Sequence, residues 1–267
     1  MKNLMVANFQ LTKAGSVKRY DLDALTTNLK AQIENSITLG WDPADIVAVT
    51  NFEFEFMGVT ATHLPLNEKC LTGSKMFAVR EHLRNRGGSV WAHDLDAWQC
   101  VPFDPPMFKD IGIATYSRPK FNGGSVFIRP SAFDIIDAIC NTLESEKREE
   151  PTLEKLLKSS LYRDRITVLN YTWNVGCSGF VKRYTLSEKP IKVVHFHPSN
   201  RMAWDTHARN RNGISIDATI PARLKDLMVK YFGDIIHTFV YEDDRGPLSV
   251  REIGVRGKTG DLNATTR

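Results

Sequence analysis

Residues 89–98 of this 267-residue chain read SVWAHDLDAW, a short apolar run that leads directly into two aspartates. The β-branched and aromatic residues at its start are typical of a buried strand. In an extended chain, or with a slight turn at Leu95, the carboxylates of Asp94 and Asp96 could share one divalent cation. For so short a motif the alternative is a loop whose aspartates only cap a turn. The neighbouring sequence has to distinguish these two interpretations.

Strands and helices alternate on both sides of this segment. Residues 4–9 and 45–50 are predicted strands, and the apolar spacing between them, opened by Asp21, predicts an amphipathic helix that ends near Gly40. A strand–helix–strand unit of this kind predicts a parallel pair of strands. The other predicted strands and helices cover residues 73–85, 111–115, 121–128, 131–143, 151–157, 166–169, 191–196 and 220–232.

This order of elements predicts one α/β domain with a mostly parallel central sheet flanked by helices. We expect the domain to cover residues 1–241. Residues 242–267 are polar, contain glycine and show no periodicity, so they are predicted to form a loosely ordered tail. In residues 121–128, the pair Gly123-Gly124 predicts a turn that leads into a strand.

Composition limits the classes of function. The chain is 42% hydrophobic and 25% charged, as in ordinary soluble proteins, and its net charge of +4 suits a polyanionic partner such as a nucleotide diphosphate or nucleic acid. No run approaches the ~20 apolar residues of a membrane span. The first nine residues are too polar for a signal peptide, and four scattered cysteines without a CxxC pair indicate reduced thiols. We therefore expect a cytoplasmic protein.

Three further segments carry polar side chains that can act with the aspartates. They read GSK at 73–75, FNGGS at 121–125 and HFHPSNRMAW at 195–204. Residues of the first and third segments have ordinary structural alternatives: Lys75 can be a solvated lysine, His195 a core histidine, Arg201 a surface cation and Trp204 a packing residue.

In this order, the four segments resemble the GT-A-fold glycosyltransferases of the glycogenin and bacterial lipopolysaccharide galactosyltransferase type. In that family a strand ends in a DxD motif that binds manganese, an FNxG segment lines the sugar pocket, and a late HFxGxxKPW segment supplies a third metal ligand and a lysine for the diphosphate. Here Arg201 stands in place of the lysine, Trp204 comes one residue late and the preceding proline is absent. The resemblance spans residues 4–205 and implies a GT-A-like, Rossmann-like fold.

The resemblance also implies a metal and donor site. Asp94, Asp96 and His195 would hold Mn²⁺ or Mg²⁺, and His197 is the rival imidazole, because it lies on the same face of an extended chain. The donor would be bound through Lys75, Asp94, Arg201 and Trp204. A fixed cation and a guanidinium suit a leaving diphosphate, because negative charge develops there during transfer.

The resemblance implies that two residues contact the transferred sugar. Asn122 belongs to the FNGG segment, and Glu150 follows Glu149 directly before Pro151, where the family has a DQ or DE pair. A solvated charged linker is the alternative for the two glutamates. The segment around Trp173 resembles one that shapes the acceptor side in the family, with core packing as its alternative.

The resemblance therefore implies a metal-dependent glycosyltransferase that moves a sugar from a nucleoside-diphosphate sugar, a UDP-sugar, to an acceptor hydroxyl on a glycan or a protein. The cations Arg201, Arg209 and Arg211 keep a hydroxymethylated base in DNA as an alternative acceptor. A nucleotidyltransferase is disfavoured, since only Gly15 interrupts residues 11–20, where a glycine-rich phosphate loop would be expected. A non-catalytic nucleotide-sugar-binding module is disfavoured by the presence of both the DxD motif and the late histidine.

Overall fold

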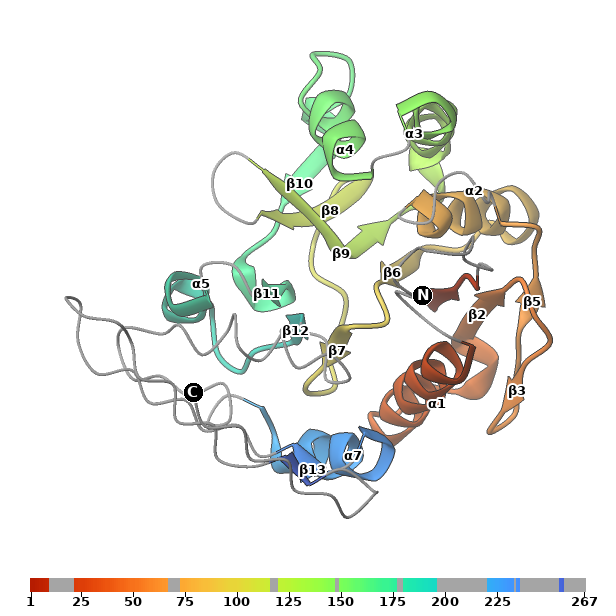
Figure 1. Ribbon diagram of the computed structural model, residues 1–267. Coiled ribbons are helices and arrows are strands. Elements are labelled where there is room, and N and C mark those ends of the chain that lie inside the picture. Colours follow the sequence, from red (N-terminus) through yellow and green to blue (C-terminus); the bar gives the residue numbers. More distant parts are fainter. Residues whose placement is uncertain are drawn as a thin grey trace, which may run out of the picture.

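A computed structural model describes residues 1–9, 22–66, 73–115, 120–146, 149–176, 180–195, 220–232, 234–235 and 255–256. Its central element is a seven-stranded sheet in the order β10-β8-β9-β6-β1-β2-β5 (Figure 1). The strands of this sheet are β1 (Lys2–Ala7), β2 (Ile46–Thr50), β5 (Thr62–His63), β6 (Val90–His93), β8 (Ile111–Thr115), β9 (Phe121–Ile128) and β10 (Ile166–Val168).

Helices cover both faces of the sheet, with α1 on one side and α2, α3 and α4 on the other (Figure 1). Alternation along the strands explains this arrangement, because successive side chains point to opposite faces. In β1, for example, Leu4 packs in the core under α2 to α4, whereas Met5 packs against α1. The helices are α1 (Leu22–Thr38), α2 (Ser74–Arg86), α3 (Phe133–Glu146), α4 (Glu149–Leu157), α5 (Phe180–Leu186) and α7 (Ala222–Phe232).

Strand β9 runs antiparallel to both of its neighbours, β6 and β8, whereas the β10–β8, β6–β1, β1–β2 and β2–β5 pairs are parallel. The beginning of β9 therefore lies at the sheet edge where β6 and β8 end. This reversal places the FNGG segment beside the DxD motif. The predicted turn at Gly123-Gly124 is wrong, because both glycines lie inside β9 and are buried.

A second, three-stranded sheet has the order β11-β12-β7 and is built from β7 (Ala97–Gln99), β11 (Val175–Gly176) and β12 (Val193–His195). Strands β7 and β12 are antiparallel, with His195 opposite Ala97. Because Ala97 directly follows Asp96, this register brings residue 195 next to the DxD motif across 99 positions of sequence.

The remaining elements are short. Two-stranded pairs are formed by β3 (Glu55–Phe56) with β4 (Val59–Thr60) and by β13 (Asp234–Ile235) with β14 (Val255–Arg256). The 3-10 turns are η1 (Pro43–Asp45), η3 (Pro130–Ala132), η4 (Arg163–Arg165) and η5 (Tyr171–Trp173). The predicted division into a domain of residues 1–241 and a tail of 242–267 stays a prediction, and β14 is the part of that tail which the structure describes.

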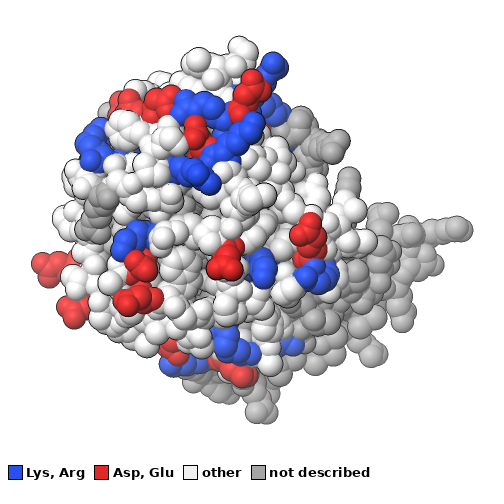
Figure 2. Space-filling view, turned by 180° about the vertical axis from the view of Figure 1, so that it is seen from behind, with Lys and Arg blue, Asp and Glu red and all other residues white. Residues whose placement is uncertain are grey.

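The predicted fold class is confirmed: a mostly parallel central sheet is flanked by helices, and the parallel β1–β2 pair is present. None of the described helices is both long and apolar enough to cross a membrane. Cys100 and Cys140 are buried free thiols, while Cys70 and Cys177 lie outside the described residues. On the face seen from behind, acidic and basic side chains are intermixed (Figure 2).

Candidate active site

The DxD motif forms a tight turn between the two sheets. Strand β6 ends at His93, and the backbone N–H of Ala97 donates to the carbonyl of Asp94 at 3.0 Å, which closes the turn over Leu95 and Asp96. The N–H of Asp94 donates to the carbonyl of Gly124 in β9 at 3.0 Å. Of the two conformations that the sequence left open, the chain adopts the turn at Leu95, and both aspartates lie at the carboxyl end of β6, where open α/β sheets bind ligands.

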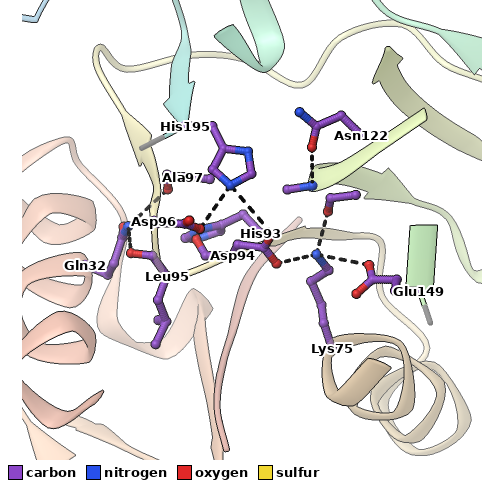
Figure 3. A network of polar contacts seen from close by, with 12 residues as sticks. Gln32, Lys75, His93, Asp94, Leu95, Asp96, Ala97, Asn122, Glu149 and His195 are labelled. Carbon is purple, nitrogen blue, oxygen red and sulfur yellow. Dashed lines mark hydrogen bonds and ion pairs between the residues drawn. The ribbon is translucent and has the colours of Figure 1, made fainter. Parts of the chain in front are cut away.

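Three predicted metal ligands come together at this turn. Ligand atoms of Asp94, Asp96 and His195 all lie within 4.8 Å of one another. The Nε2 atom of His195 is 3.0 Å from Oδ1 of Asp96 and 3.8 Å from Oδ2 of Asp94 (Figure 3). Two carboxylates and one imidazole are a donor set that a divalent cation such as Mn²⁺ accepts, so the residues present fit a metal site.

The pKa of His195 is set by burial and by the two neighbouring aspartates. Burial alone would lower the pKa of the imidazole, but the charges of Asp96 and Asp94 and the hydrogen bond to Asp96 raise it above its ordinary value. The two carboxylates therefore favour the protonated imidazole, whose positive charge would offset part of the negative charge gathered at the turn. A metal ion would have to replace this proton, since only neutral imidazole is a ligand.

Lys75 is a buried member of the same cluster. Its Nζ donates to Oδ1 of Asp94 and to the carbonyl of Gly123, each at 2.5 Å, and lies 3.3 Å from Oε1 of Glu149 (Figure 3). Burial alone would lower the pKa of the ammonium, but Asp94 and Glu149 raise it above its ordinary value. The alternative of a solvated first-turn lysine is therefore wrong, and a fixed positive charge stands next to the candidate metal site.

The structure places Glu149, and not Glu150, in this cluster. The two glutamates open α4, and successive helical residues point about 100° apart, so only one of them can face the sheet. Glu149 is 8% exposed and paired with Lys75, whereas Glu150 is exposed. Burial, opposed by Lys75, raises the pKa of Glu149 to about 7. We therefore replace Glu150 with Glu149 in the candidate site and discard the solvated-linker alternative for Glu149.

Asn122 and the two glycines after it form the floor of the site. The Oδ1 atom of Asn122 accepts from the N–H of Gly124 at 2.9 Å, and its Nδ2 is buried without a hydrogen-bond partner among the described residues. A β-carbon at Gly123 would lie 2.7 Å from Oε1 of Glu149, and one at Gly124 would overlap the ring of His195. The FNGG sequence thus allows a carboxylate and an imidazole to contact the strand directly.

The tryptophans in the described part of the chain are packing residues. Trp98 is fully buried and meets Phe232 edge to face, with ring centroids 6.1 Å apart. Trp173 meets Phe103 and Phe127 in the same way at 5.0 Å and 5.2 Å. The predicted residues Arg201 and Trp204, the rival ligand His197, and the cations Arg209 and Arg211 lie outside the described residues.

His93 supports the site, and its role was not predicted from the sequence. His93 is buried, with Nδ1 3.0 Å from the carbonyl of Asp94 and Nε2 2.8 Å from Oδ1 of Asn3. Burial lowers the pKa of His93 to about 4, so the ring is neutral and supports the turn by hydrogen bonding and by stacking on Trp91. The signal was a polar ring at the end of an otherwise apolar strand, immediately before the first aspartate.

The chain has the GT-A fold of the glycosyltransferases. No family model matches it, and no curated protein matches its sequence. Among solved structures, it is similar to the galactosyltransferase LgtC in complex with donor and acceptor sugar analogs, at 12% identity and a TM-score of 0.53, covering 86% of this chain and 96% of that one. It is also similar to the glycosyltransferase GlyE of Streptococcus pneumoniae TIGR4, at 10% identity and a TM-score of 0.52, covering 86% of this chain and 63% of that one. At these identities the likeness establishes the fold.

Proposed function

We propose that the protein is a metal-dependent glycosyltransferase that moves a sugar from a nucleoside-diphosphate sugar to an acceptor hydroxyl. The observation that carries this proposal is the convergence of Asp94, Asp96 and His195 at the carboxyl end of the central sheet. The GT-A fold adds to it, because solved glycosyltransferases share this architecture.

The negative charge of the leaving diphosphate needs compensation. Asp94, Asp96 and His195 would hold Mn²⁺ or Mg²⁺, and a divalent cation, when bound, stabilises the charge that develops on the leaving group. Lys75 keeps Asp94 in place through a 2.5 Å hydrogen bond and adds a fixed positive charge beside the same site. Arg201 and Trp204, which the resemblance assigns to the donor, remain a sequence-based part of this proposal.

The sugar would lie over the start of β9. Asn122 offers a buried Nδ2 that no described residue uses, and an amide N–H₂ is suited to sugar hydroxyl and ring oxygens. The carboxylate of Glu149, which belongs to α4, packs against Gly123 of this strand and can accept from sugar hydroxyls. Glu149 is paired with Lys75, which also binds Asp94 and the carbonyl of Gly123, the residue after Asn122, so Glu149 would hold the sugar beside the diphosphate.

A screen of nucleotide-sugar hydrolysis tests the proposal and needs no acceptor. The protein is incubated with a panel of UDP-, GDP- and CDP-sugars, with Mn²⁺ or with excess chelator, and the release of nucleoside diphosphate is measured. We expect slow hydrolysis of at least one donor, a UDP-sugar, only when Mn²⁺ is present. Hydrolysis that is unchanged by chelator would contradict the metal assignment, and no hydrolysis or binding of any donor would contradict the proposed class of enzyme.

A further inference from the structure

Gln32, in the middle of α1, reaches across to the DxD turn. Its Nε2 donates to the carbonyl of Leu95 at 2.9 Å and to the carbonyl of Ala97 at 3.1 Å (Figure 3). Leu95 and Ala97 are the two residues on either side of Asp96. One side-chain amide therefore holds the backbone before and after a candidate metal ligand.

The two aspartates of the motif are anchored from different elements. The backbone of Asp94 is bound to β9, through the carbonyl of Gly124, and its carboxylate is bound by Lys75. From α1, the side chain of Gln32 holds the backbone on both sides of Asp96. Ala97, which Gln32 also holds, lies opposite His195 in the β7–β12 pair, so the same amide supports two of the three ligands.

Gln32 is itself held in a fixed position. It is 1% exposed, and the α1 residues next to it, Leu29 and Ile33, are buried against the sheet. Its backbone carbonyl accepts from Oγ of Ser36 at 2.8 Å, and Ser36 in turn accepts from Nδ2 of Asn3 in β1 at 2.9 Å. Because α1 is bound to the central sheet, the Gln32 amide fixes the position of the DxD turn relative to that sheet.

We infer that Gln32 is a positioning residue of the metal site: its double hydrogen bond to Leu95 and Ala97 keeps Asp96 directed toward Asp94 and His195. This inference rests on the proposed function, because it assumes that these three residues bind a divalent cation. Loss of a group that orients a metal ligand commonly costs about 10–100-fold in metal affinity. Removal of the Gln32 amide is therefore expected to weaken Mn²⁺ binding through the backbone carbonyls of Leu95 and Ala97 that it holds.

Asn35 supplies a matched control on the same helix. It is fully buried, and its Nδ2 donates to the carbonyl of Gln99, at the end of β7 away from Asp96, at 3.0 Å. Its Oδ1 also accepts from Arg223 of α7 at 2.9 Å. The variant Asn35→Leu therefore loses at least as many buried hydrogen bonds as Gln32→Met, but none at the turn.

The experiment is a Mn²⁺ titration followed by the electron paramagnetic resonance signal of free Mn²⁺, together with thermal unfolding in the absence of metal. We expect Gln32→Met to raise the Kd for Mn²⁺ by about 10–100-fold. Asn35→Leu should leave that Kd within about twofold of wild type, while both variants lower the Tm. If Gln32→Met does not fold, Gln32→Asn, whose amide is one methylene shorter, should show a smaller loss of affinity in the same direction.

Two results separate this inference from the proposal on which it rests. Wild-type affinity in the Gln32 variants, or an equal loss in Asn35→Leu, would overturn the positioning role and leave the metal site standing. A wild-type protein that binds no Mn²⁺ would overturn the metal site itself, and the positioning role with it.

Discussion

The imidazole of His195 lies so close to the α-carbon of Gly124 that a β-carbon there would overlap both Nδ1 and Cε1 of the ring. This contact joins β12 of the small sheet to β9 of the central sheet. The observed position of His195 therefore requires a residue without a side chain at position 124, the second glycine of FNGG. Two motifs that are 71 positions apart in sequence (195 minus 124) therefore form one structural unit.

Gly124→Ala should displace the imidazole from the metal site. We expect the Kd for Mn²⁺ to rise at least about tenfold and the free energy of unfolding to fall by about 1–3 kcal/mol, because a methyl group would be forced into a filled space. The matched control is Gly88→Ala, since a β-carbon at residue 88 meets no atom within 4 Å. Retention of wild-type Mn²⁺ affinity in Gly124→Ala would show that His195 is not a ligand.

Replacing the histidines one at a time decides between the two candidate imidazoles. His195→Ala should weaken Mn²⁺ binding about 10–100-fold, because the described geometry places its Nε2 between the two aspartates. His197→Ala should leave the affinity close to that of wild type. Isothermal titration with Mn²⁺ measures both, and a larger loss in His197→Ala would reverse the assignment.

Glu149→Gln should alter the pH dependence of stability. Burial raises the pKa of Glu149 to about 7, above its value of 4.5 in the unfolded chain, so between these two values the folded state holds more protons than the unfolded state. Wild type should therefore lose stability relative to Glu149→Gln as the pH rises from 4.5 to 7, and the difference should be constant outside this window. Thermal unfolding of both proteins from pH 4 to 8 measures it, and a difference independent of pH would contradict the buried-carboxylate description.

The DNA acceptor makes a separate prediction. If the acceptor is DNA, replacing Arg209 and Arg211 with alanine should weaken binding to duplex DNA and flatten its salt dependence, because fewer counterions are released. Hydrolysis of the sugar donor should be unchanged. On the described part of the face in Figure 2, basic side chains lie next to acidic ones. A wild-type protein with no salt-sensitive retention on duplex DNA would exclude this acceptor.

Local patterns predicted the strand that ends at His93, since it follows from residues next to one another in sequence, and left open whether the chain stays extended or turns at Leu95. The partnership of His195 with the aspartates depends on the register of β7 with β12, which no spacing contains, and the prediction came from the family resemblance. Gly123-Gly124 was misread as a turn, because a close tertiary approach and a turn both favour glycine.

The roles of Glu149 and Gln32 also depend on tertiary structure that local sequence patterns do not contain. The sequence could not show that Glu149, and not Glu150, lies beside Lys75, because this depends on the rotational phase of α4, which is set by where the helix begins. The role of Gln32 was not visible in the sequence, because a glutamine on an amphipathic helix reads as an ordinary polar residue until its partners Leu95 and Ala97 are known.

The most direct test of the account is to measure Mn²⁺-dependent release of nucleoside diphosphate from the sugar donor by wild type and Asp96→Asn. The account predicts Mn²⁺-dependent release by wild type, because Asp94, Asp96 and His195 would hold the ion. It predicts no Mn²⁺-dependent release by an Asp96→Asn protein that unfolds at a temperature close to that of wild type. Full activity of Asp96→Asn, or equal activity of wild type in excess chelator, would contradict it.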